Sequence, residues 1–354
     1  MNKRRLRKAI SRIRALPINH YLVLYLLNKA KHFYFKYSHS TRVARPSTIM
    51  LELTNHCNLA CTTCPREYDS GKAMDKGSMD KSAAFSIIDE LWPYLDSIGL
   101  TGMGETFMYR EIEEVAGYIK SKNKGIVISV STNAQLPGFI EKIENLAGKI
   151  DTIQVSVDGL GDVYELIRKK ADFSTLDENL KQLSMLCRNT KTDIMLNMVV
   201  TRENYRQMSL IVDFAAQRNI RYVDFTLFNL AAVTNFDPSY YRFYESPEFL
   251  AACAELDKRI EENKTVEVTR YFRTEKSFRK CPFPWTHFYV CWNGFMVPCC
   301  AKPFPKELNF GNSFESGIME VLNSKAYRKF RELWYAGKTP EFCRKCHFTE
   351  TGLN

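Results

Sequence analysis

The chain has 354 residues, of which 45% are hydrophobic and 25% are charged. These are values of an ordinary globular protein, and they exclude a disordered chain, a collagen and a multi-span membrane protein. The formal net charge of +10 would suit a nucleic-acid-binding protein, but 12 of the 50 Lys and Arg residues and none of the 40 Asp and Glu residues lie within residues 1–45. The basic charge therefore belongs to one N-terminal arm, and no nucleic-acid partner is expected.

Residues 1–45 are predicted to form a basic amphipathic arm of one or two helices, the first around residues 4–14, with a break at Pro17. The stretch from Tyr21 to Tyr37 mixes Leu, Val, Phe and Tyr with lysines. Such a helix could lie on an anionic membrane surface, or it could pack on the protein's own body with its lysines in solvent. The apolar run is short and no small-residue cleavage site follows it, which excludes a signal peptide. We expect a cytoplasmic protein, membrane-associated if the arm binds lipid.

From Pro46 onward the sequence alternates between strand and helix patterns. Strands are predicted at Thr48–Leu53, Ser97–Thr101, Ile126–Ser131, Thr152–Val157, Asp193–Val200 and Tyr222–Leu227. Helices are predicted between them at Lys81–Tyr94, Glu111–Lys122, Gly138–Ala147, Val163–Cys187 (in one or two pieces) and Tyr205–Arg218. This order predicts an α/β fold with a parallel sheet, a partial (β/α)6 barrel over residues 46–228. Ligands of such sheets bind at the carboxyl ends of the strands.

The remaining chain divides into two further segments. Residues 229–280 are predicted to be a connector with a helix near Glu248–Asn263. Residues 281–354 are rich in Cys, Pro and aromatic residues and contain a predicted helix near Ile318–Trp334. A small Cys-rich domain of that kind usually needs metal to hold it together.

Three cysteines, Cys57, Cys61 and Cys64, follow the first predicted strand at Cx3Cx2C spacing. Three thiolates on one loop can hold three corners of a [4Fe–4S] cluster and leave the fourth iron open for a small molecule. A zinc site completed by a neighbour such as His56 would have the same spacing. The spacing alone does not separate the two.

The surroundings of this loop resemble the radical S-adenosylmethionine (radical SAM) superfamily. Thr101-Gly-Met-Gly-Glu105 resembles the glycine-rich segment with which that family meets the amino group of S-adenosylmethionine, and Ser131-Thr-Asn133 and Val155-Ser156-Val-Asp158-Gly159 resemble its ribose and carboxylate contacts. Arg168 is similar to an arginine that some members direct at the bound cofactor or substrate. The resemblance covers residues 46–228, and the S-adenosylmethionine-binding residues that it implies are Gly102, Gly104, Glu105, Ser131, Asn133, Ser156, Asp158 and Arg168.

A second set of cysteines lies in the C-terminal segment. Cys281, Cys299, Cys343 and Cys346 have the spacing C-x17-C-x43-C-x2-C, which resembles the auxiliary-cluster domain called SPASM or its shorter relative, twitch. Full SPASM domains use seven cysteines and two clusters, whereas no cysteine follows Cys346. We therefore expect one auxiliary [4Fe–4S] cluster with four protein ligands. Cys300 could replace Cys299, and four cysteines ending in Cx2C also describe a zinc ribbon.

The resemblance implies an enzyme that uses S-adenosylmethionine and two [4Fe–4S] clusters with an external reductant of the flavodoxin or ferredoxin kind. S-adenosylmethionine would be cleaved reductively to a 5′-deoxyadenosyl radical that abstracts hydrogen from a substrate C–H bond. With the auxiliary cluster as electron acceptor, the enzyme would be an oxidoreductase that dehydrogenates its substrate. A thiol that returns a hydrogen atom would make it an epimerase instead, and the candidate donors are Cys187, Cys253, Cys291 and Cys300.

The substrate is expected to be a sugar, an aminocyclitol or a glycan, because the basic arm is too short to resemble the leader-binding domain of many peptide-modifying relatives. A peptide-modifying maturase is the alternative within the family. A protein of another class, a non-catalytic zinc protein whose basic arm binds nucleic acid, would show strongly salt-dependent binding.

Overall fold

The computed structural model describes residue 15 and residues 19–233, 235–272 and 281–347. The backbone packs as two units, which are described separately. Unit 1 contains Met1–His56, Met74–Val130 and Lys280–Phe342, and unit 2 contains Cys57–Ala73, Ser131–Arg279 and Cys343–Asn354. The basic helix predicted around residues 4–14 lies outside the described residues.

Unit 1 contains a mostly parallel sheet with the strand order β3-β2-β1-β8-β9. Its strands are β1 (Thr48–Leu51), β2 (Ser97–Leu100), the first four residues of β3 (Val127–Thr132), β8 (Phe288–Val290) and β9 (Met296–Val297). β8 runs parallel to β1 and turns back into the antiparallel β9. The C-terminal Cys-rich segment is therefore hydrogen-bonded to the first strand of the chain.

The described helices of unit 1 are α2 (His20–Tyr37), α4 (Lys81–Leu91), α5 (Ile112–Lys122), α11 (Phe283–Thr286), α12 (Ser313–Ser316), α13 (Ile318–Leu322) and α14 (Lys325–Tyr335). Side chains cap the starts of α2, α4, α12 and α14. The Asp80 carboxylate accepts the Ser82 N–H at the start of α4, and the Ser324 hydroxyl accepts the Tyr327 N–H at the start of α14. Caps of this kind satisfy N–H groups that have no partner within the helix.

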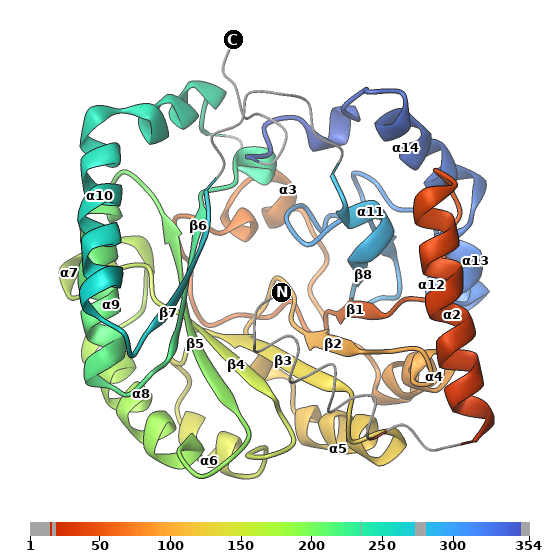
Figure 1. The fold of residues 1–354 in the computed structure, drawn as a ribbon, viewed down its shortest axis with the longest axis horizontal. Coiled ribbons are helices and arrows are strands. Elements are labelled where there is room, and N and C mark those ends of the chain that lie inside the picture. The colour runs from red at the N-terminus through yellow and green to blue at the C-terminus, as the bar shows by residue number, and fades with distance from the viewer. Residues whose placement is uncertain (1–14, 16–18, 234, 273–280, 348–354) are drawn as a thin grey trace. The chain divides into compact units, whose positions relative to one another are not determined.

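Unit 2 contains a fully parallel sheet with the strand order β4-β5-β6-β7. Its strands are β4 (Thr152–Ser156), β5 (Asp193–Val200), β6 (Tyr222–Leu227) and β7 (Glu267–Tyr271). Its helices are α3 (Asp69–Lys72), α6 (Phe139–Glu144), α7 (Asp162–Ile167), α8 (Phe173–Cys187), α9 (Met208–Gln217) and α10 (Pro247–Glu262). In Figure 1, α8, α9 and α10 lie along one side of these strands, and α9 contacts both β6 and α10. Val155, Leu196 and Val223 form part of the buried core.

The predicted α/β class with a parallel sheet and a Cys-rich segment behind it is confirmed. All six predicted strands are present, and the predicted helix at Val163–Cys187 is two helices, α7 and α8. The sequence did not predict β7, because its residues are only half-buried or exposed and carry no alternating apolar pattern. The predicted domain boundaries at residues 45, 228 and 280 stay a prediction. No helix in the described ranges has the length and apolar character needed to cross a membrane.

Candidate active site

The cysteine loop of residues 57–64 lies in unit 2, where it is fixed to the segment that follows α7. The Thr62 N–H donates to the Ile167 carbonyl at 2.8 Å, and the Ala60 N–H donates to the Lys169 carbonyl at 3.2 Å. The three cysteines of the loop form no disulfide bond. These two hydrogen bonds place the loop beside Arg168, which lies between Ile167 and Lys169 in the chain.

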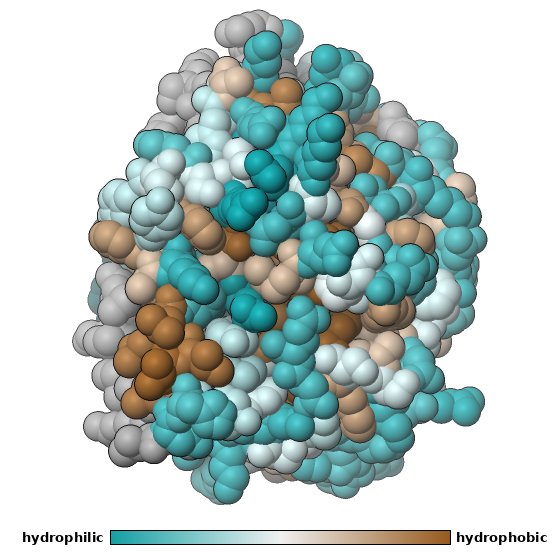
Figure 2. Space-filling model, turned by 90° about the vertical axis from the view of Figure 1, so that its right-hand side faces the viewer, coloured by the Kyte–Doolittle hydropathy of each residue, from teal (hydrophilic) through white to brown (hydrophobic). Residues whose placement is uncertain are grey.

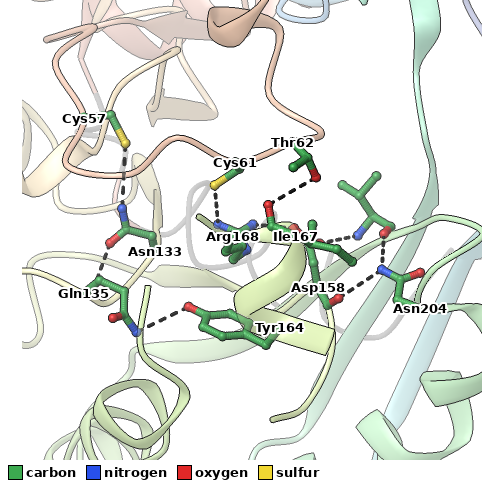
Figure 3. A network of polar contacts seen from close by, with 11 residues as sticks. Cys57, Cys61, Thr62, Asn133, Gln135, Asp158, Tyr164, Ile167, Arg168 and Asn204 are labelled. Carbon is green, nitrogen blue, oxygen red and sulfur yellow. Dashed lines mark hydrogen bonds and ion pairs between the residues drawn. The ribbon is translucent and has the colours of Figure 1, made fainter. Parts of the chain in front are cut away.

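Two side chains place nitrogen donors beside sulfur atoms of the loop (Figure 3). Asn133 Nδ2 lies 3.8 Å from Cys57 Sγ, and Arg168 Nη1 lies 3.9 Å from Cys61 Sγ. Asn133 Nδ2 also donates to Asn58 Oδ1 at 2.9 Å, so its amide is fixed from within the loop. Donors of this kind stabilise the thiolate, which is the form of cysteine that binds metal.

The Arg168 guanidinium is held by a buried carboxylate. Its Nη2 atom lies 2.9 Å from Asp158 Oδ2, and the Asp158 side chain is fully buried. Asp158 Oδ1 accepts the Val199 N–H at 2.8 Å, and the Asp158 carbonyl accepts from Asn204 Nδ2 at 3.0 Å (Figure 3). Burial alone would lower the pKa of Arg168, but the charges of Asp158 and Cys61 outweigh it, so the pKa is raised. Arg168 is therefore a fixed positive charge beside the cysteine loop.

The donor set fits an iron–sulfur cluster. Burial raises the pKa of the Cys61 thiol to about 11 and that of Cys64 to about 12, so these sulfurs ionise at neutral pH only when a metal replaces the proton. Arg168 Nε is buried and makes no hydrogen bond in the described structure. Among the described residues, no three His, Cys, Asp or Glu side chains are already arranged around one ion. Three cysteines on one loop, none of them in a disulfide, with an adjacent guanidinium and amide nevertheless fit a cluster that has three protein ligands and an open iron.

The glycine-rich segment lies in unit 1 and is packed against the backbone that leads to the cysteine loop. A Cβ atom on Gly102 would lie 2.3 Å from Glu52 Cγ, and one on Gly104 would lie 2.4 Å from the His56 carbonyl oxygen. The Glu105 N–H donates to that same carbonyl at 2.7 Å. Glycine is thus required at both positions for close approach of the backbone. Glu105 is buried, and one of its carboxylate oxygens accepts a backbone N–H at the start of the next helical turn.

Glu52 is a buried residue of this region that the sequence analysis missed. Its Oε1 atom accepts the Met103 N–H and the Tyr289 hydroxyl, each at 2.9 Å, and its Oε2 atom accepts the Trp292 N–H at 3.3 Å. One carboxylate therefore joins the end of the first strand, the glycine-rich segment and the β8–β9 hairpin. The only signal in the sequence is an acidic residue between Leu51 and Leu53 in an otherwise apolar strand.

The predicted S-adenosylmethionine-binding residues fall into two groups. Asn133, Asp158 and Arg168 are brought together with the cysteine loop in unit 2, whereas the glycine-rich segment belongs to unit 1. Ser131, in β3, and Ser156, the last residue of β4, belong to unit 2 and are half-buried. Their roles toward the cofactor stay predictions.

The second set of cysteines is also divided, with Cys281 and Cys299 in unit 1 and Cys343 and Cys346 in unit 2. Burial raises the pKa of the Cys299 thiol to about 12. In unit 2, Cys346 Sγ accepts from Asn229 Nδ2 at 3.5 Å, and the Cys346 N–H lies 3.4 Å from the Cys343 carbonyl in a tight turn.

Cys291 is buried with Tyr289 and Val297 in an apolar cluster, and Cys300 packs against it. This is the environment of a small hydrophobic residue. The assignment of Cys299 to the auxiliary cluster stays a prediction.

A pocket of about 220 Å³ in unit 2 adjoins the cysteine loop. Its wall combines the loop, the segment after α7 and the residues that follow β5 and β6. The lining residues are Thr62, Thr63, Leu166, Ile167, Lys169, Thr201, Glu203, Phe228, Phe236 and Tyr240. None of the four candidate hydrogen-donor cysteines is among them. Of these four, Cys187 is buried in α8, and Cys253 is half-buried in α10.

The chain matches two family models. The first describes the radical SAM superfamily and matches residues 51–215. The second describes an iron–sulfur cluster-binding domain, SPASM, and matches residues 281–347.

Three known proteins illustrate what this chain is similar to. The tungsten-containing aldehyde ferredoxin oxidoreductase cofactor-modifying protein of Pyrococcus furiosus is 25% identical over 304 residues, which cover 80% of this chain and 82% of that protein. The antilisterial bacteriocin subtilosin biosynthesis protein AlbA of Bacillus subtilis is 24% identical over 332 residues, 92% of this chain and 69% of AlbA. SuiB of Streptococcus suis, crystallised with its precursor peptide SuiA, has a TM-score of 0.67 at 16% identity and covers 92% of this chain and 75% of its own. The likeness to SuiB shows a shared fold.

Proposed function

Because the chain belongs to the radical SAM superfamily and carries a C-terminal SPASM-type domain, we propose that it is an oxidoreductase that dehydrogenates a sugar, an aminocyclitol or a glycan. When the cluster and S-adenosylmethionine are bound, they supply the 5′-deoxyadenosyl radical that removes a hydrogen atom from an unactivated C–H bond. We further propose that the auxiliary cluster accepts the second electron of the oxidation.

The observation that carries the proposal is the polar arrangement at the cysteine loop. Asn133 and Arg168 approach the sulfurs of Cys57 and Cys61, and Asp158 fixes the guanidinium from behind. A cluster with three thiolate ligands is anionic, so a buried cation beside it stabilises the loaded site. In this proposal, Gly102 and Gly104 admit the methionine end of the cofactor, and Glu105 accepts from its amino group.

The pocket beside the loop supports a polar substrate with C–H groups on its faces. Phe228, Phe236 and Tyr240 give it aromatic surface, while Lys169 and Glu203 place a cation and an anion at its wall. Aromatic rings contact the C–H faces of a sugar ring, and charged side chains bind its hydroxyl or amino groups. Thr62 and Thr63 belong both to this wall and to the cysteine loop, which would place a bound substrate next to the site of radical formation.

The lining of the same pocket favours dehydrogenation over epimerisation. An epimerase needs a hydrogen donor on the far face of its substrate, and no candidate thiol lines the pocket. The two reactions differ in their hydrogen balance. In heavy water, dehydrogenation yields a product that lacks two hydrogen atoms, whereas epimerisation yields a product that has gained one deuterium from the solvent-exchanged thiol.

Peptide modification is the second candidate function. It is favoured by AlbA, a bacteriocin biosynthesis protein whose match covers 92% of this chain, and by the precursor peptide bound in the SuiB structure. Mass spectrometry separates the candidates, because one predicts loss of hydrogen from a carbohydrate and the other a changed mass in a peptide.

The first experiment compares the anaerobically reconstituted protein with its Cys57/Cys61/Cys64→Ala variant. We expect about eight irons per chain in the wild type and about four in the variant, the content of two clusters and of one. Chemical reduction with S-adenosylmethionine should release 5′-deoxyadenosine from the wild type alone. Zinc at either site, or an iron content that the substitutions leave unchanged, would contradict the proposed function.

A further inference from the structure

The outward face of α2 is apolar along the helix. Its residues recur at spacings of three and four, which places them on one side of a helix. Six of them expose between 55% and 66% of their surface, and Ala30 is exposed as well. We call this set the α2 outer face: Val23, Leu26, Leu27, Ala30, Phe33, Tyr34 and Tyr37. None of these residues carries a charge.

The opposite face of α2 fixes the orientation of the helix in unit 1. Tyr25 and Asn28 are buried, the Tyr25 hydroxyl donates to Asp96 at 2.6 Å, and Asn28 Nδ2 donates to the Arg45 carbonyl at 2.9 Å. The outer face therefore stays in solvent while the other face is packed. Figure 2 looks onto the side on which Figure 1 shows α2, and a hydrophobic patch stands out there from a mainly hydrophilic surface. A large apolar patch in contact with water usually marks an interaction site.

The charge around the outer face points to the chemistry of its partner. Lys31 and Lys36 are exposed on the same helix. The sequence that precedes it adds seven basic residues and no acidic one: Lys3, Arg4, Arg5, Arg7, Lys8, Arg12 and Arg14. Apolar and aromatic side chains flanked by cations match an anionic bilayer, because the apolar groups enter the acyl boundary while the cations meet the lipid headgroups.

We propose that the α2 outer face, together with Lys31 and Lys36 on the same helix, binds the surface of an anionic membrane. A nucleic acid would be contacted by cations, since its phosphates dominate the affinity, whereas the surface that α2 presents outward is apolar. The interaction is independent of the proposed reaction, because no residue of the cysteine loop or of the pocket takes part in it.

The test measures co-sedimentation of the full-length, cluster-loaded protein with vesicles of phosphatidylcholine alone or of phosphatidylcholine with an equal share of phosphatidylglycerol. We expect binding to the anionic vesicles, weakened by added salt. The Leu26→Gln/Leu27→Gln/Phe33→Gln variant should bind them roughly tenfold or more weakly, because it loses apolar contact with the bilayer. The control, Met185→Gln/Leu250→Gln, changes exposed apolar residues on α8 and α10 and should bind like the wild type.

Charge reversal provides a second, independent variant. Lys31→Glu/Lys36→Glu should weaken binding to the anionic vesicles and leave the residual binding to neutral vesicles unchanged. Iron content identifies any variant that has not folded. The proposal is overturned if the glutamine variant binds vesicles like the wild type, if the protein prefers a DNA duplex to the vesicles, or if the substitutions only convert a dimer into a monomer.

Discussion

Arg168 and Asp158 form an ion pair in which each charge depends on the other. Arg168 is 9% exposed as a residue and Asp158 is fully buried. Removing one partner of a buried pair leaves the other charge without compensation and costs more than the pair itself contributes. The stability of unit 2 and the charge at the cysteine loop therefore depend on the same two side chains.

We predict that Arg168→Gln lowers the free energy of unfolding by about 3–5 kcal/mol, because it isolates the Asp158 carboxylate. The double variant Asp158→Asn/Arg168→Gln should recover a large part of this loss, since neither charge remains. Denaturant unfolding of cluster-free protein measures both changes. Lys181→Gln is the control, because Lys181 is an exposed residue of α8 that pairs with Asp177; it should change stability by less than about 0.5 kcal/mol. A double variant as unstable as the single one would argue against the ion pair as the cause.

At this scale the sequence identified individual residues better than it identified their partners. Asp158, Arg168 and Asn133 were predicted as a cofactor group, and they do meet at the cysteine loop. The pairing of Arg168 with Asp158 could not be predicted, because it depends on the direction that α7 takes relative to the preceding strand, β4. Glu52 was missed because its hydrogen-bond partners lie 51, 237 and 240 positions away in the chain, beyond the reach of any local pattern.

At the scale of elements, α2 is attached to unit 1 by a few polar side chains, one of which is the imidazole of His32. His32 Nε2 lies 2.8 Å from the Arg45 carbonyl oxygen. Burial lowers the pKa of His32 from its ordinary value of 6.5; the hydrogen bond to Arg45 opposes the shift, and the charge of Lys29 adds to it. The folded protein therefore binds this proton less readily than the unfolded chain.

We predict that attachment of α2 weakens in mild acid. The contribution of neutral His32 is complete above pH 6.5 and is lost as the pH falls through the lowered pKa. Hydrogen exchange of the α2 amides should show protection decreasing as the pH falls below 6.5, after correction for the intrinsic rate. His32→Gln keeps a donor for Arg45 and should flatten this dependence, whereas His20→Gln, at the exposed start of α2, should leave it unchanged. A pH profile that His32→Gln does not alter would refute the assignment.

Local periodicity predicted the elements well and their environment less well. Each of the six predicted strands exists because buried apolar residues recur along it. For residues 21–37 the sequence left lipid and the protein's own body as alternatives, and the helix does pack on the body through Tyr25 and Asn28. A pattern of apolar residues gives a helix its faces, but only the tertiary structure shows which face is covered. β7 carries almost no such pattern, since its register is set by β6.

At the scale of the whole molecule, the proposed reaction requires the two sets of cysteines to have separate tasks. We predict that Cys343→Ala/Cys346→Ala lowers the iron content from about eight to about four per chain. Release of 5′-deoxyadenosine should persist, because the first loop is intact, but the oxidised product should disappear. Quantifying 5′-deoxyadenosine and the oxidised product in one reaction measures how far cleavage of S-adenosylmethionine is coupled to oxidation of the substrate. Cys253→Ala, a half-buried cysteine of α10, is the control and should alter neither. If the variant formed as much oxidised product as the wild type, the auxiliary cluster would not take part in the reaction.

The pairing of β8 with β1 limits how this architecture can be divided or recombined. A fragment that begins at residue 281 would carry β8 away from β1 and Tyr289 away from the Glu52 carboxylate. A chain cut before that point would leave one edge of β1 open and Glu52 facing the glycine-rich segment without its hydroxyl donor. The C-terminal segment therefore cannot be exchanged for that of another protein without regard to β1 and Glu52. A chimaera that takes this segment from another protein must also bring a strand that fits β1 and a hydroxyl group that reaches position 52.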